Sequence, residues 1–554
     1  MRPLSRWGWV AVALAPVVVM AAMVVPASRN IAFWDEIDTA IDFIIRLDAG
    51  AGWREVVERL FAVNNEHRMV TSRLIFAASY WLTGTVNFHV IGAIGNLCLV
   101  GACAILVAAQ SGWPRRLRMG VMLAFLMFQL GHFENFFWSG ASIDHFQVVT
   151  LAVGALAALA RGTPGGVALG AALALLATFT LAHGVAVWPV GALLLWQQRR
   201  QSHLLAWLGC AAAAAVLFLW GFVFNPANRI SEPGLAAAWG IIRYWLSLLG
   251  APLTLGHAAW APLPGAVLVA GLAWLAARGA IRRQPLAFFA AIYAIAALAL
   301  VAYGRSAVAG TEINSRYMVL GALAWAMLLV LVLERHSHPR RPLRLLAAAT
   351  PALAGLAVAA HLHFAPQVET FVAVRDRAAS RFAHYGEDGR DFVRLHPRER
   401  HADALLRTAA ERGLYSLPHV SRRVEFTGTQ PNPKVVRHLD ELLVNDRAIT
   451  VGGWAMRRGE VSKRGQVHVV LRSAATTLYF TTVTLPRPDV ATAYKEPGWR
   501  LAGFRAVIRR DRLPAEDFEV GVLILDGARA ELAMTNERLL LASGPTRPER
   551  AALE

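Results

Sequence analysis

A succession of long apolar blocks constrains this chain more than any other feature of its sequence. The blocks fill residues 1 to about 363 of the 554, and many approach the roughly 20 apolar residues that a helix needs to cross about 30 Å of hydrocarbon. Because 56% of the residues are hydrophobic and only 17% are charged, the sequence predicts a polytopic membrane protein. From Pro366 onward, charge, proline and alternating patterns return, which predicts a second, hydrophilic part.

Arginines in the short loops predict the topology, because positive residues accumulate on the cytoplasmic side of a membrane. The N-terminal run resembles a signal peptide, but its length of about 20 residues and the many blocks after it favour an uncleaved first membrane helix. Applied block by block, the arginine rule predicts eleven spans. Their approximate ranges are 7–27, 87–110, 118–133, 146–160, two short helices within 164–198, 203–223, 264–279, 285–303, 317–333 and 344–363.

Two parts of this assignment depend on the charges around them. Arg161 and the pair Arg199 and Arg200 fall on one side only if residues 164–198 form two short helices that meet near His183 and Gly184. Residues 235–256 are predicted to form an interfacial or re-entrant helix, because a full span there would reverse every later sign. An odd number of spans then places the first loop, residues 28–86, and the C-terminal region on the extracytoplasmic side.

The net charge of +18 does not predict a nucleic-acid partner. The excess is almost entirely arginine, much of which lies in the short loops. A GC-rich bacterial genome explains this bias, and a basic ligand-binding surface is the alternative. All three cysteines fall inside apolar blocks, so neither a disulfide framework nor a thiolate metal site is expected.

The first loop begins with the acidic stretch "FWDEIDTAID", directly after the first membrane helix. A helix from Asp35 would place Asp35, Asp38 and Asp42 on one face and isoleucines on the other, as in a helix that lies on a membrane surface. Acidic residues also favour the first turn of any helix, which is the structural alternative. However, carboxylates at the hydrocarbon boundary are costly without a partner, so Asp35 and Glu36 are candidates for a functional site.

The other outward loops carry groups that suit the same site. "NNEHRMVTSRL" contributes His67 and Arg68. "HFENFFWSGASIDHF" contributes Glu134 and Asp144, and its aromatic residues can equally form an interfacial belt. "YGRSAVAGTEINSRY" contributes arginines that oppose the topological bias; a bound phosphate would explain them, and an ion pair with Glu312 is the alternative. His183 is more readily explained as a core histidine than as a ligand.

These features together resemble the multispanning glycosyltransferases of superfamily C, which include the protein O-mannosyltransferases and the lipid A aminoarabinose transferases. "FWDE" resembles the acidic pair that these proteins carry in a long first external loop. "NEHRMVTSRL" with "YWLTGTVNFHVIGAIGN" resembles the descent of that loop into the second helix, and "GR…SRY" resembles an external segment that carries arginines. The resemblance covers about residues 6–363, and it lies in the order and topology of short motifs.

The resemblance implies a polyprenyl-phosphate-linked sugar donor and a glycan or glycolipid acceptor from the cell envelope. Asp35 would be the general base and Glu36 would orient the acceptor or Asp35. The residues expected to hold the lipid phosphate are Arg305, Arg316 and Tyr317, and the further substrate-binding candidates are His67, Arg68 and Glu134. Some relatives use a divalent cation, for which Glu134 or Asp144 is a candidate ligand, but the second external loop lacks a DxD pair, so metal dependence stays open.

The C-terminal region is predicted to contain polar helices over residues 364–430 and an antiparallel β-sandwich over residues 431–545, followed by a tail at 546–554. Its short alternating runs are separated by Gly, Pro and Asp turns. Such a domain would suit glycan binding. Trp454, Tyr479 and Trp499 are the candidate stacking residues, although a position in the core explains them as well.

The sequence therefore predicts an enzyme of the bacterial inner membrane, a glycosyltransferase with a transmembrane core over residues 1–363 and an extracytoplasmic C-terminal domain. The alternative is a transporter or flippase of lipid-linked saccharides. Transporters tend to bury charge in the middle of interrupted spans, whereas here charge gathers at the external ends of the helices. A scaffold that anchors the β-domain is a third possibility, and it would not require so many spans.

Overall fold

The structure is a computed structural model of the 554-residue chain. It describes residues 5–223, 234–309, 312–335, 341–385, 395–415, 421, 423–426, 429–444, 448–458, 466–526 and 529–541. These residues divide into two compact units. The helical unit contains Met1–Arg29, Asp35–Val368 and Glu411–Tyr415, and the C-terminal unit contains Asn30–Trp34, Glu369–Ala410 and Ser416–Glu554.

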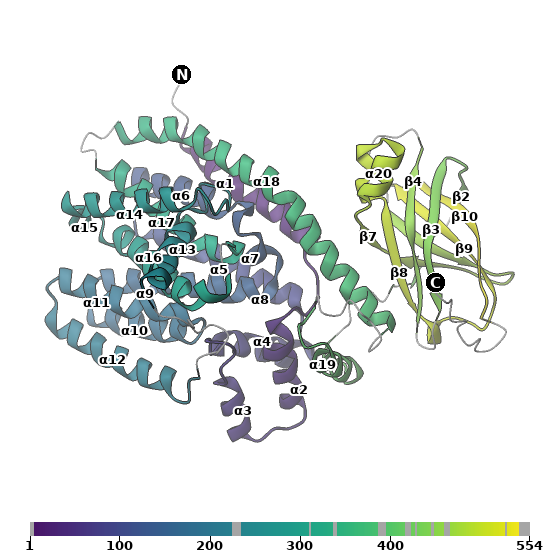
Figure 1. The fold of residues 1–554 in the computed structure, drawn as a ribbon, viewed down its shortest axis with the longest axis horizontal. Helices are drawn as coiled ribbons and strands as arrows, with labels where there is room; N and C mark the ends of the chain where they lie inside the picture. Colours follow the sequence, from purple (N-terminus) through teal and green to yellow (C-terminus); the bar gives the residue numbers. More distant parts are fainter. Residues whose placement is uncertain are drawn as a thin grey trace. The chain divides into compact units, whose positions relative to one another are not determined.

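The helical unit is a bundle of apolar helices (Figure 1). In the part of the chain that the structure describes, seven helical segments are long and apolar enough to cross a membrane: Arg6–Ala27, Phe88–Ala108, Ser139–Ala160, Gln201–Leu219, Pro285–Arg305, Ser315–Glu334 and Arg344–Asp376. The bundle helices are α1 (Arg6–Ala27), α5 (Phe88–Ala108), α6 (Trp113–Met127), α9 (Gln147–Ala160), α10 (Pro164–Thr178), α11 (Val187–Gln197), α12 (Gln201–Leu219), α13 (Leu235–Gly250), α14 (Pro262–Ala277), α16 (Pro285–Ala309), α17 (Met318–Glu334) and α18 (Arg341–Tyr385). The membrane character predicted from composition is thus confirmed by helix length and apolarity.

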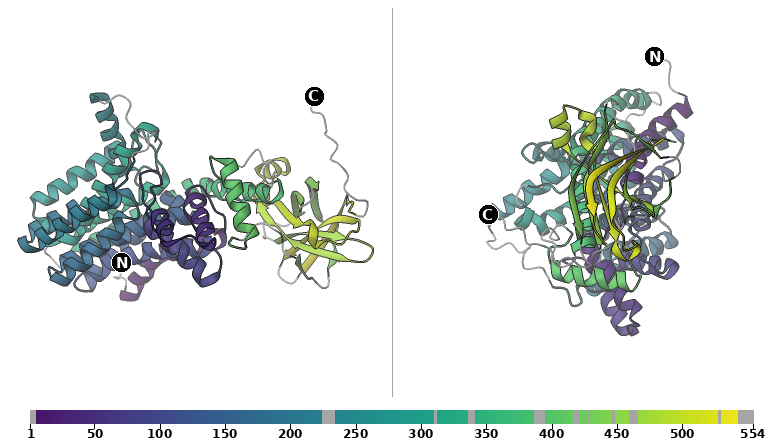
Figure 2. Two further views of the ribbon diagram at one scale, coloured as in Figure 1. Left: turned by 90° about the horizontal axis from the view of Figure 1, so that it is seen from below. Right: turned by 90° about the vertical axis from the view of Figure 1, so that its right-hand side faces the viewer.

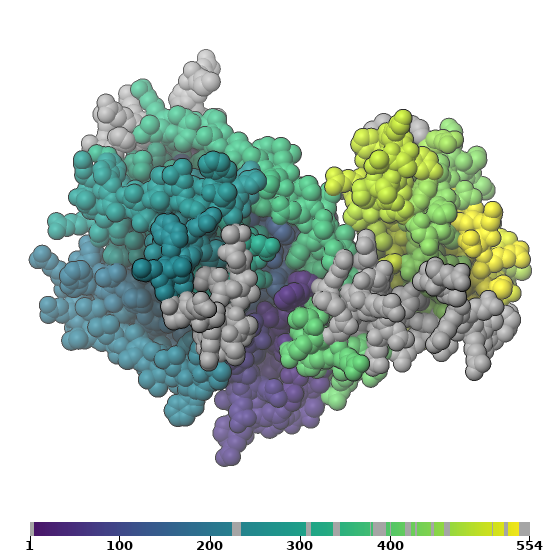
Figure 3. Space-filling model, viewed as in Figure 1, coloured from purple at the N-terminus to yellow at the C-terminus, as the bar shows by residue number. Residues whose placement is uncertain are grey.

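Helices of the first loop form a lobe that projects from the bundle, coloured purple in the space-filling view (Figure 3). The lobe contains α2 (Asp42–Asp48), α3 (Trp53–Leu60) and α4 (Val70–Thr83). A wider π-helical segment, Ile37–Ile41, precedes α2. None of the side chains of α3 is buried, and Trp53 is 73% exposed. An amphipathic helix with an exposed apolar face suits the surface of a membrane.

Two short helices occupy residues 164–198, as predicted. A short turn, Ala182–Ala186, joins α10 to α11 and contains His183 and Gly184. Gly184 packs closely against α10, because a Cβ atom on it would lie 2.1 Å from the carbonyl oxygen of Ala177. The residues before α10 and after α11 lie side by side, because a Cβ atom on Gly162 would lie 2.9 Å from Nε of Arg200. The arginine rule requires this closeness of the two ends.

Other loop arginines gather at that same end of the bundle. Arg199 and Arg282 line one cavity between α11 and the start of α16. Arg115 pairs with Glu334 at the end of α17, at an N–O distance of 3.2 Å, and Arg118 contacts the same carboxylate. The opposite ends of α16 and α17 carry Arg305 and Ser315–Tyr317. Each of these two helices thus connects the arginine-rich end to the other end.

Helix α13 lies within the segment predicted to be interfacial or re-entrant. Its second half, from Tyr244 to Gly250, is largely buried, and the helix contacts α14, α16 and α17, whereas Leu235 and Trp239 in its first half are exposed. Its last residue, Gly250, meets the start of α14 so closely that a Cβ would lie 1.9 Å from the carbonyl oxygen of Ala261. From there α14 runs in the same direction as α17, because Gly271 lies beside Leu328 and the Arg335 guanidinium lies 4.3 Å from the Trp274 ring.

Helix α18 is longer than the sequence pattern indicated. It runs for 45 residues from Arg341 to Tyr385 and includes Pro351 and Pro366. The predicted eleventh span ends at about residue 363, where polarity rises. Helix propensity continues beyond that point, and Pro366 does not end the helix. The change in polarity therefore marks a change of surroundings and not the end of the helix.

The C-terminal unit contains α19 (Glu399–Glu411) and two sheets that form a sandwich, which Figure 2 shows from two directions. One sheet has the order β1-β6-β5-β9-β10-β2 and the other β3-β4-β8-β7. The strands are β1 (Arg423–Val424), β2 (Gln430–Pro431), β3 (Val435–Val444), β4 (Ala448–Arg457), β5 (Gln466–Arg472), β6 (Thr477–Thr481), β7 (Val483–Leu485), β8 (Gly503–Arg509), β9 (Phe518–Asp526) and β10 (Arg529–Leu539). All strand pairs are antiparallel except β2 with β10.

Alternating residues of both sheets fill the space between them. This core contains Ile449 and Val451 of β4, Phe504 of β8 and Val520 and Val522 of β9. A helix, α20 (Pro488–Tyr494), and the turn Pro497–Leu501 cover part of the outer face of the four-stranded sheet. The predicted C-terminal sheet region is thus present, and its inward-facing residues follow the period of two that a sandwich requires.

Candidate functional site

A polar pocket lies in the helical unit at the end opposite the loop arginines. It contains about 530 Å³ of space, part of it open to solvent. Three segments that are far apart in the sequence meet there: the first loop, the segment between α6 and α9, and the turn before α17. Its lining residues are Asp35, Glu36, Thr39, Asn65, His67, Met69, Phe76, Trp138, Gly140, Ala141, Asp144, His145, Leu181, Arg305, Arg316 and Tyr317.

Asp35 lies in the first turn of the helix that opens the first loop. Its backbone carbonyl accepts a hydrogen bond from the Thr39 hydroxyl at 2.6 Å, which fixes the start of the π-helical segment. Its side chain is less constrained: Oδ1 accepts a hydrogen bond from Nδ2 of Asn64 at 3.2 Å. The carboxylate of Asp35 is therefore oriented by a neutral partner and faces the pocket, which leaves it available to a substrate.

Glu36 is held much more tightly than Asp35. It is 1% exposed, and its Oε1 accepts a hydrogen bond from the backbone N–H of Gly140 at 2.5 Å. Gly140 is required there, because a Cβ atom would lie 2.9 Å from Cγ of Glu36 and 3.2 Å from Nε1 of Trp138. Glu36 therefore joins the first loop to the segment before α9.

A third carboxylate, Asp144, lies at the base of the pocket. It belongs to a π-helical segment, Ser142–Phe146, and its Oδ1 accepts a hydrogen bond from the Ser72 hydroxyl at 2.5 Å. Arg73, the next residue of α4, donates to the carbonyl oxygens of Leu60 and Ala62 at 3.0 and 2.8 Å. The first loop and the segment between α6 and α9 are thus connected by polar contacts as well as by packing.

Basic and aromatic side chains also line the pocket. The Arg316 guanidinium lies 5.7 Å from the Trp138 ring and 5.5 Å from the Tyr317 ring. Arg305 Nη2 is 3.9 Å from Oε2 of Glu66, so the acidic residue found beside Arg305 is Glu66 and not Glu312, the partner considered as the alternative to a phosphate. The pocket thus holds both carboxylates and guanidinium groups, an arrangement that can bind an anion beside a group that accepts a proton.

Three histidines lie close to these side chains. The rings of His145 and His183 stack at 5.9 Å, and His145 meets Tyr317 edge to face at 5.5 Å. Nδ1 of His67 accepts a hydrogen bond from the backbone N–H of Ala182 at 3.1 Å. Burial, and then the nearby Arg305, lower the pKa of His67 from 6.5 to about 3. His67 is therefore neutral at pH 7, and its remaining proton is on Nε2.

Glu134, a predicted substrate-binding residue, contacts the turn that carries Arg316. Its Oε2 accepts hydrogen bonds from the Ser315 hydroxyl at 2.8 Å and from the backbone N–H of Arg316 at 3.1 Å. The side chain of Asn135 donates to the carbonyl oxygen of Arg316 at 2.9 Å. These contacts fix the turn that presents Arg316 to the pocket, so Glu134 acts through the position of Arg316.

Arg68 is the predicted site residue that the structure places elsewhere. Its guanidinium donates to the carbonyl oxygens of Phe218 and Trp220 at the end of α12, with the Phe218 contacts at 2.8 and 3.1 Å, and to that of Phe61 at 2.6 Å. The last carbonyls of a helix lack partners within the helix, and Arg68 satisfies them. Asp42 is likewise outside the pocket, paired with Arg46 at 3.2 Å.

Sequence reasoning did not single out Asn64 and Ser72, which contact two of the three carboxylates. Both belong to the polar stretch "NNEHRMVTSR", in which His67 and Arg68 attracted attention through their charge. The available signal was the density of polar residues just before an apolar helix. Among the residues that the structure describes, three or more His, Cys, Asp or Glu side chains nowhere gather closely enough to hold a metal ion.

Comparisons with models of protein families, with curated protein sequences and with solved structures return no match for this chain. The fold and the pocket therefore define its class by themselves. The class is a helical membrane protein with a C-terminal sheet region and a polar pocket at one end of the bundle.

Proposed function

We propose that this protein is an integral-membrane glycosyltransferase that moves a sugar from a polyprenyl-phosphate donor to a glycan or glycolipid of the cell envelope. One observation carries the proposal: Asp35, from the first external loop, lines the same pocket as Arg305 and Arg316, from the last. Glycosyl transfer needs a base for the attacking hydroxyl and positive groups for the phosphate that leaves. The pocket supplies both at the mouth of a membrane-spanning bundle.

In the proposed reaction, a hydroxyl oxygen of the acceptor attacks the anomeric carbon of the donor sugar. The bond between that carbon and the phosphate oxygen breaks, and Asp35 takes the hydroxyl proton. The sugar passes through a cation-like state, and a single displacement inverts its configuration. Arg305 and Arg316 stabilise the charge on the departing lipid phosphate, with Tyr317 and the Nε2–H of His67 as further donors.

Glu36 has a positioning role in this scheme. Its carboxylate accepts a hydrogen bond from the backbone N–H of Gly140, so it fixes the position of Asp35 relative to the segment that carries Asp144. Of the two predicted metal ligands, Asp144 lines the pocket, whereas Glu134 holds the backbone of Arg316. Asp35 and Asp144 would be the carboxylate ligands of a divalent cation. Among the described residues they are too few for a complete cation site, and no step of the proposed reaction depends on a cation.

The proposed orientation places the pocket and the C-terminal unit on the extracytoplasmic side of the bacterial inner membrane, with eleven spans. The gathering of loop arginines at the end of the bundle opposite the pocket supports it. The path of α13 supports the odd number of spans, because α14 starts beside the end of α13 and then runs towards the arginine-rich end. A reporter fused after Glu554 is expected to signal from the extracytoplasmic side, and a cytoplasmic signal would refute this orientation.

The decisive experiment is transfer by the purified full-length chain, supplied with a panel of radiolabelled polyprenyl-phosphate sugars and a cell-envelope glycan fraction. The parent is expected to transfer one of these sugars. Asp35→Asn is expected to slow transfer by roughly 100-fold to 10,000-fold, the range for loss of a general base. If Asp35→Asn matches the parent, Asp35 is not the base. If labelled lipid crosses reconstituted vesicles without transfer of sugar, the protein is a flippase and the proposed enzyme activity is wrong.

A further inference from the structure

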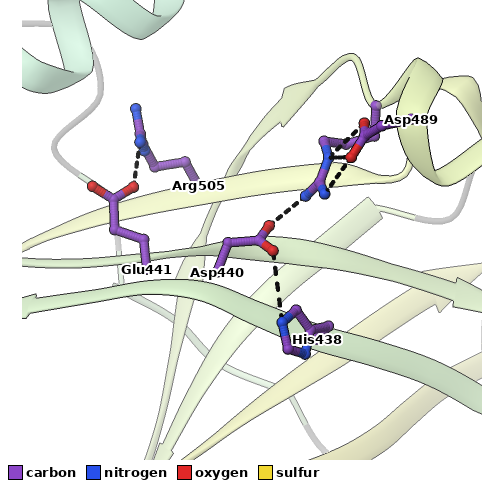
Figure 4. Close-up of polar contacts among 6 residues, drawn as sticks. His438, Asp440, Glu441, Asp489 and Arg505 are labelled. Carbon is purple, nitrogen blue, oxygen red and sulfur yellow. Dashed lines mark hydrogen bonds and ion pairs between the residues drawn. The ribbon is translucent and has the colours of Figure 1, made fainter.

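The outer face of the four-stranded sheet in the C-terminal unit carries an unusual set of exposed side chains. His438 and Asp440 of β3 and Asp489 and Tyr494 of α20 are all exposed, with Tyr494 42% accessible. Figure 4 shows His438, Asp440 and Glu441 of β3, with Arg505 facing Glu441 and with Asp489 joined to Asp440 through Arg487. We call the set formed by His438, Asp440, Glu441, Arg487, Tyr494 and Arg505 the outer-sheet array.

A β-bulge creates this array. The register between β3 and β4 shifts between Leu439 and Glu441, so that Asp440 is the extra residue. The bulge allows both His438 and Glu441 to lie on the outer face, although they are three positions apart along the strand. Gly452, opposite Glu441, has no side chain above the sheet, and a Cβ there would lie 3.1 Å from Oε2 of Glu441. No side chain of β4 therefore rises beneath Glu441 at this position.

Charges in the outer-sheet array are paired and nearly balanced. Arg487 contacts both Asp440 and Asp489, with Nη2 2.7 Å from the latter. Arg505 contacts Glu441 through Nη2, and its Nε and Nη1 are buried with no hydrogen-bond partner in the described part of the chain. Buried guanidinium nitrogens are costly when unsatisfied. The array thus displays carboxylate acceptors and guanidinium donors side by side without a strong net charge.

An aromatic cluster borders the array at its other end. The ring of Tyr494 lies 5.3 Å from Trp454 and 4.9 Å from Trp499, and both tryptophans are less than 10% exposed. The buried pair explains two of the three predicted stacking residues as core, and Tyr479 is likewise 9% exposed on the other sheet. Tyr494 is the ring that remains accessible, and the tryptophans hold it in a fixed orientation.

We infer that the outer-sheet array is a saccharide-binding site, in which the Tyr494 ring stacks on a sugar and the charged pairs bind hydroxyl groups. On β4, Trp454 lies opposite His438, and Gly452 lies opposite both Glu441 and Arg505. These two positions of β4 are about 7 Å apart, which is close to the size of one sugar unit. Alternating donors and acceptors with little net charge match a neutral polyol, and they match neither a nucleic acid nor another polyanion.

This inference rests on the proposed function, because the saccharide it assigns is the glycan acceptor. Holding a polymer on the C-terminal unit would raise its local concentration at the membrane surface without any contact to the reacting sugar. The site therefore affects the Michaelis constant for a long acceptor, and it leaves transfer to a short one unchanged.

The test measures binding of fluorescently labelled neutral hexasaccharides, built from gluco, galacto, manno or arabino units, to the full-length protein in nanodiscs. At least one is expected to bind, and Tyr494→Ala and His438→Ala are expected to weaken binding tenfold or more. Val444→Ala, at an exposed position of the same strand, is the matched control and should bind as the parent does. Thermal unfolding checks that all variants are folded.

Two outcomes would overturn the inference. Either no hexasaccharide binds the parent, or Tyr494→Ala and His438→Ala bind as tightly as the parent. Asp35→Asn separates this inference from the proposed function, because it should slow transfer by roughly 100-fold or more and leave hexasaccharide binding intact. Binding by a protein that transfers no sugar from any donor would retain the saccharide site and reject the enzyme activity.

Discussion

The side-chain amide of Asn64 donates a hydrogen bond to Oδ1 of Asp35 at 3.2 Å. A neutral donor orients a carboxylate without strongly opposing its protonation, which suits a base that must take up a proton. Asn64→Ala is therefore expected to reduce the turnover number by about tenfold, the effect of roughly 1.4 kcal/mol in the barrier. Asn64→Asp is expected to be worse, because a second carboxylate beside Asp35 leaves both without the donor.

Steady-state transfer assays on the purified variants check this prediction. Leu74→Ala is the control, because Leu74 is 44% exposed on α4 in the same loop and does not line the pocket. A turnover number for Asn64→Ala equal to that of the parent would show that Asp35 needs no orientation by Asn64.

Gly140 provides a test of Glu36 that leaves Glu36 itself in place. A methyl group at Gly140 would lie 2.9 Å from Cγ of Glu36, so Gly140→Ala must displace that buried side chain. We expect at least a tenfold loss of transfer with a small loss of stability. Gly165→Ala is the matched control, because a Cβ at Gly165, in the first turn of α10, meets no atom within 4 Å. Similar rates for both variants would argue against a positioning role for Glu36.

Much of the helical unit follows from the sequence, because apolar length and loop charge are local signals. The two short helices around His183 illustrate this point: the positions of Arg161 and Arg200 require them, and the structure contains them. The continuation of α18 past residue 363 was not predictable in the same way. Polarity rises at Pro366, and a rise in polarity does not distinguish the end of a helix from its exit into water.

The pocket was predictable only in part. The charge and location of Asp35, Arg305 and Arg316 identified them, and the structure brings all three to one pocket. Arg68 carries the same charge as Arg305 and Arg316 and lies in the same loop as Asp35, yet it binds the carbonyl groups that end α12, some 150 residues away in the sequence. A pattern of residue types cannot separate these two uses of arginine, because the difference depends on a contact between distant segments.

The contrast between Arg68 and Arg305 is itself testable. Arg68→Met removes the donors for three carbonyl groups, so it is expected to destabilise the protein by about 2–4 kcal/mol and to lower the apparent melting temperature. Arg305→Met is expected to raise the Michaelis constant for the donor by about tenfold or more with little change in melting temperature. Thermal unfolding and donor titrations on both variants are the measurements. The reverse pattern would assign Arg68 to the donor and Arg305 to the structure.

The lowered pKa of His67 predicts how stability depends on pH. Its pKa is about 3 in the folded protein and 6.5 when unfolded, so only the unfolded chain takes up a proton as the pH falls from 6.5 towards 3. His67 therefore contributes full stability above pH 6.5, and its contribution falls by on the order of a few kcal/mol towards pH 3. The apparent melting temperature, measured in detergent at pH 7.5 and at pH 4.5, should drop less in His67→Gln than in the parent. His438→Gln, at an exposed position in the C-terminal unit, is the control and should drop as the parent does. An equal drop in His67→Gln and the parent would show that the buried imidazole is not a source of the acid sensitivity.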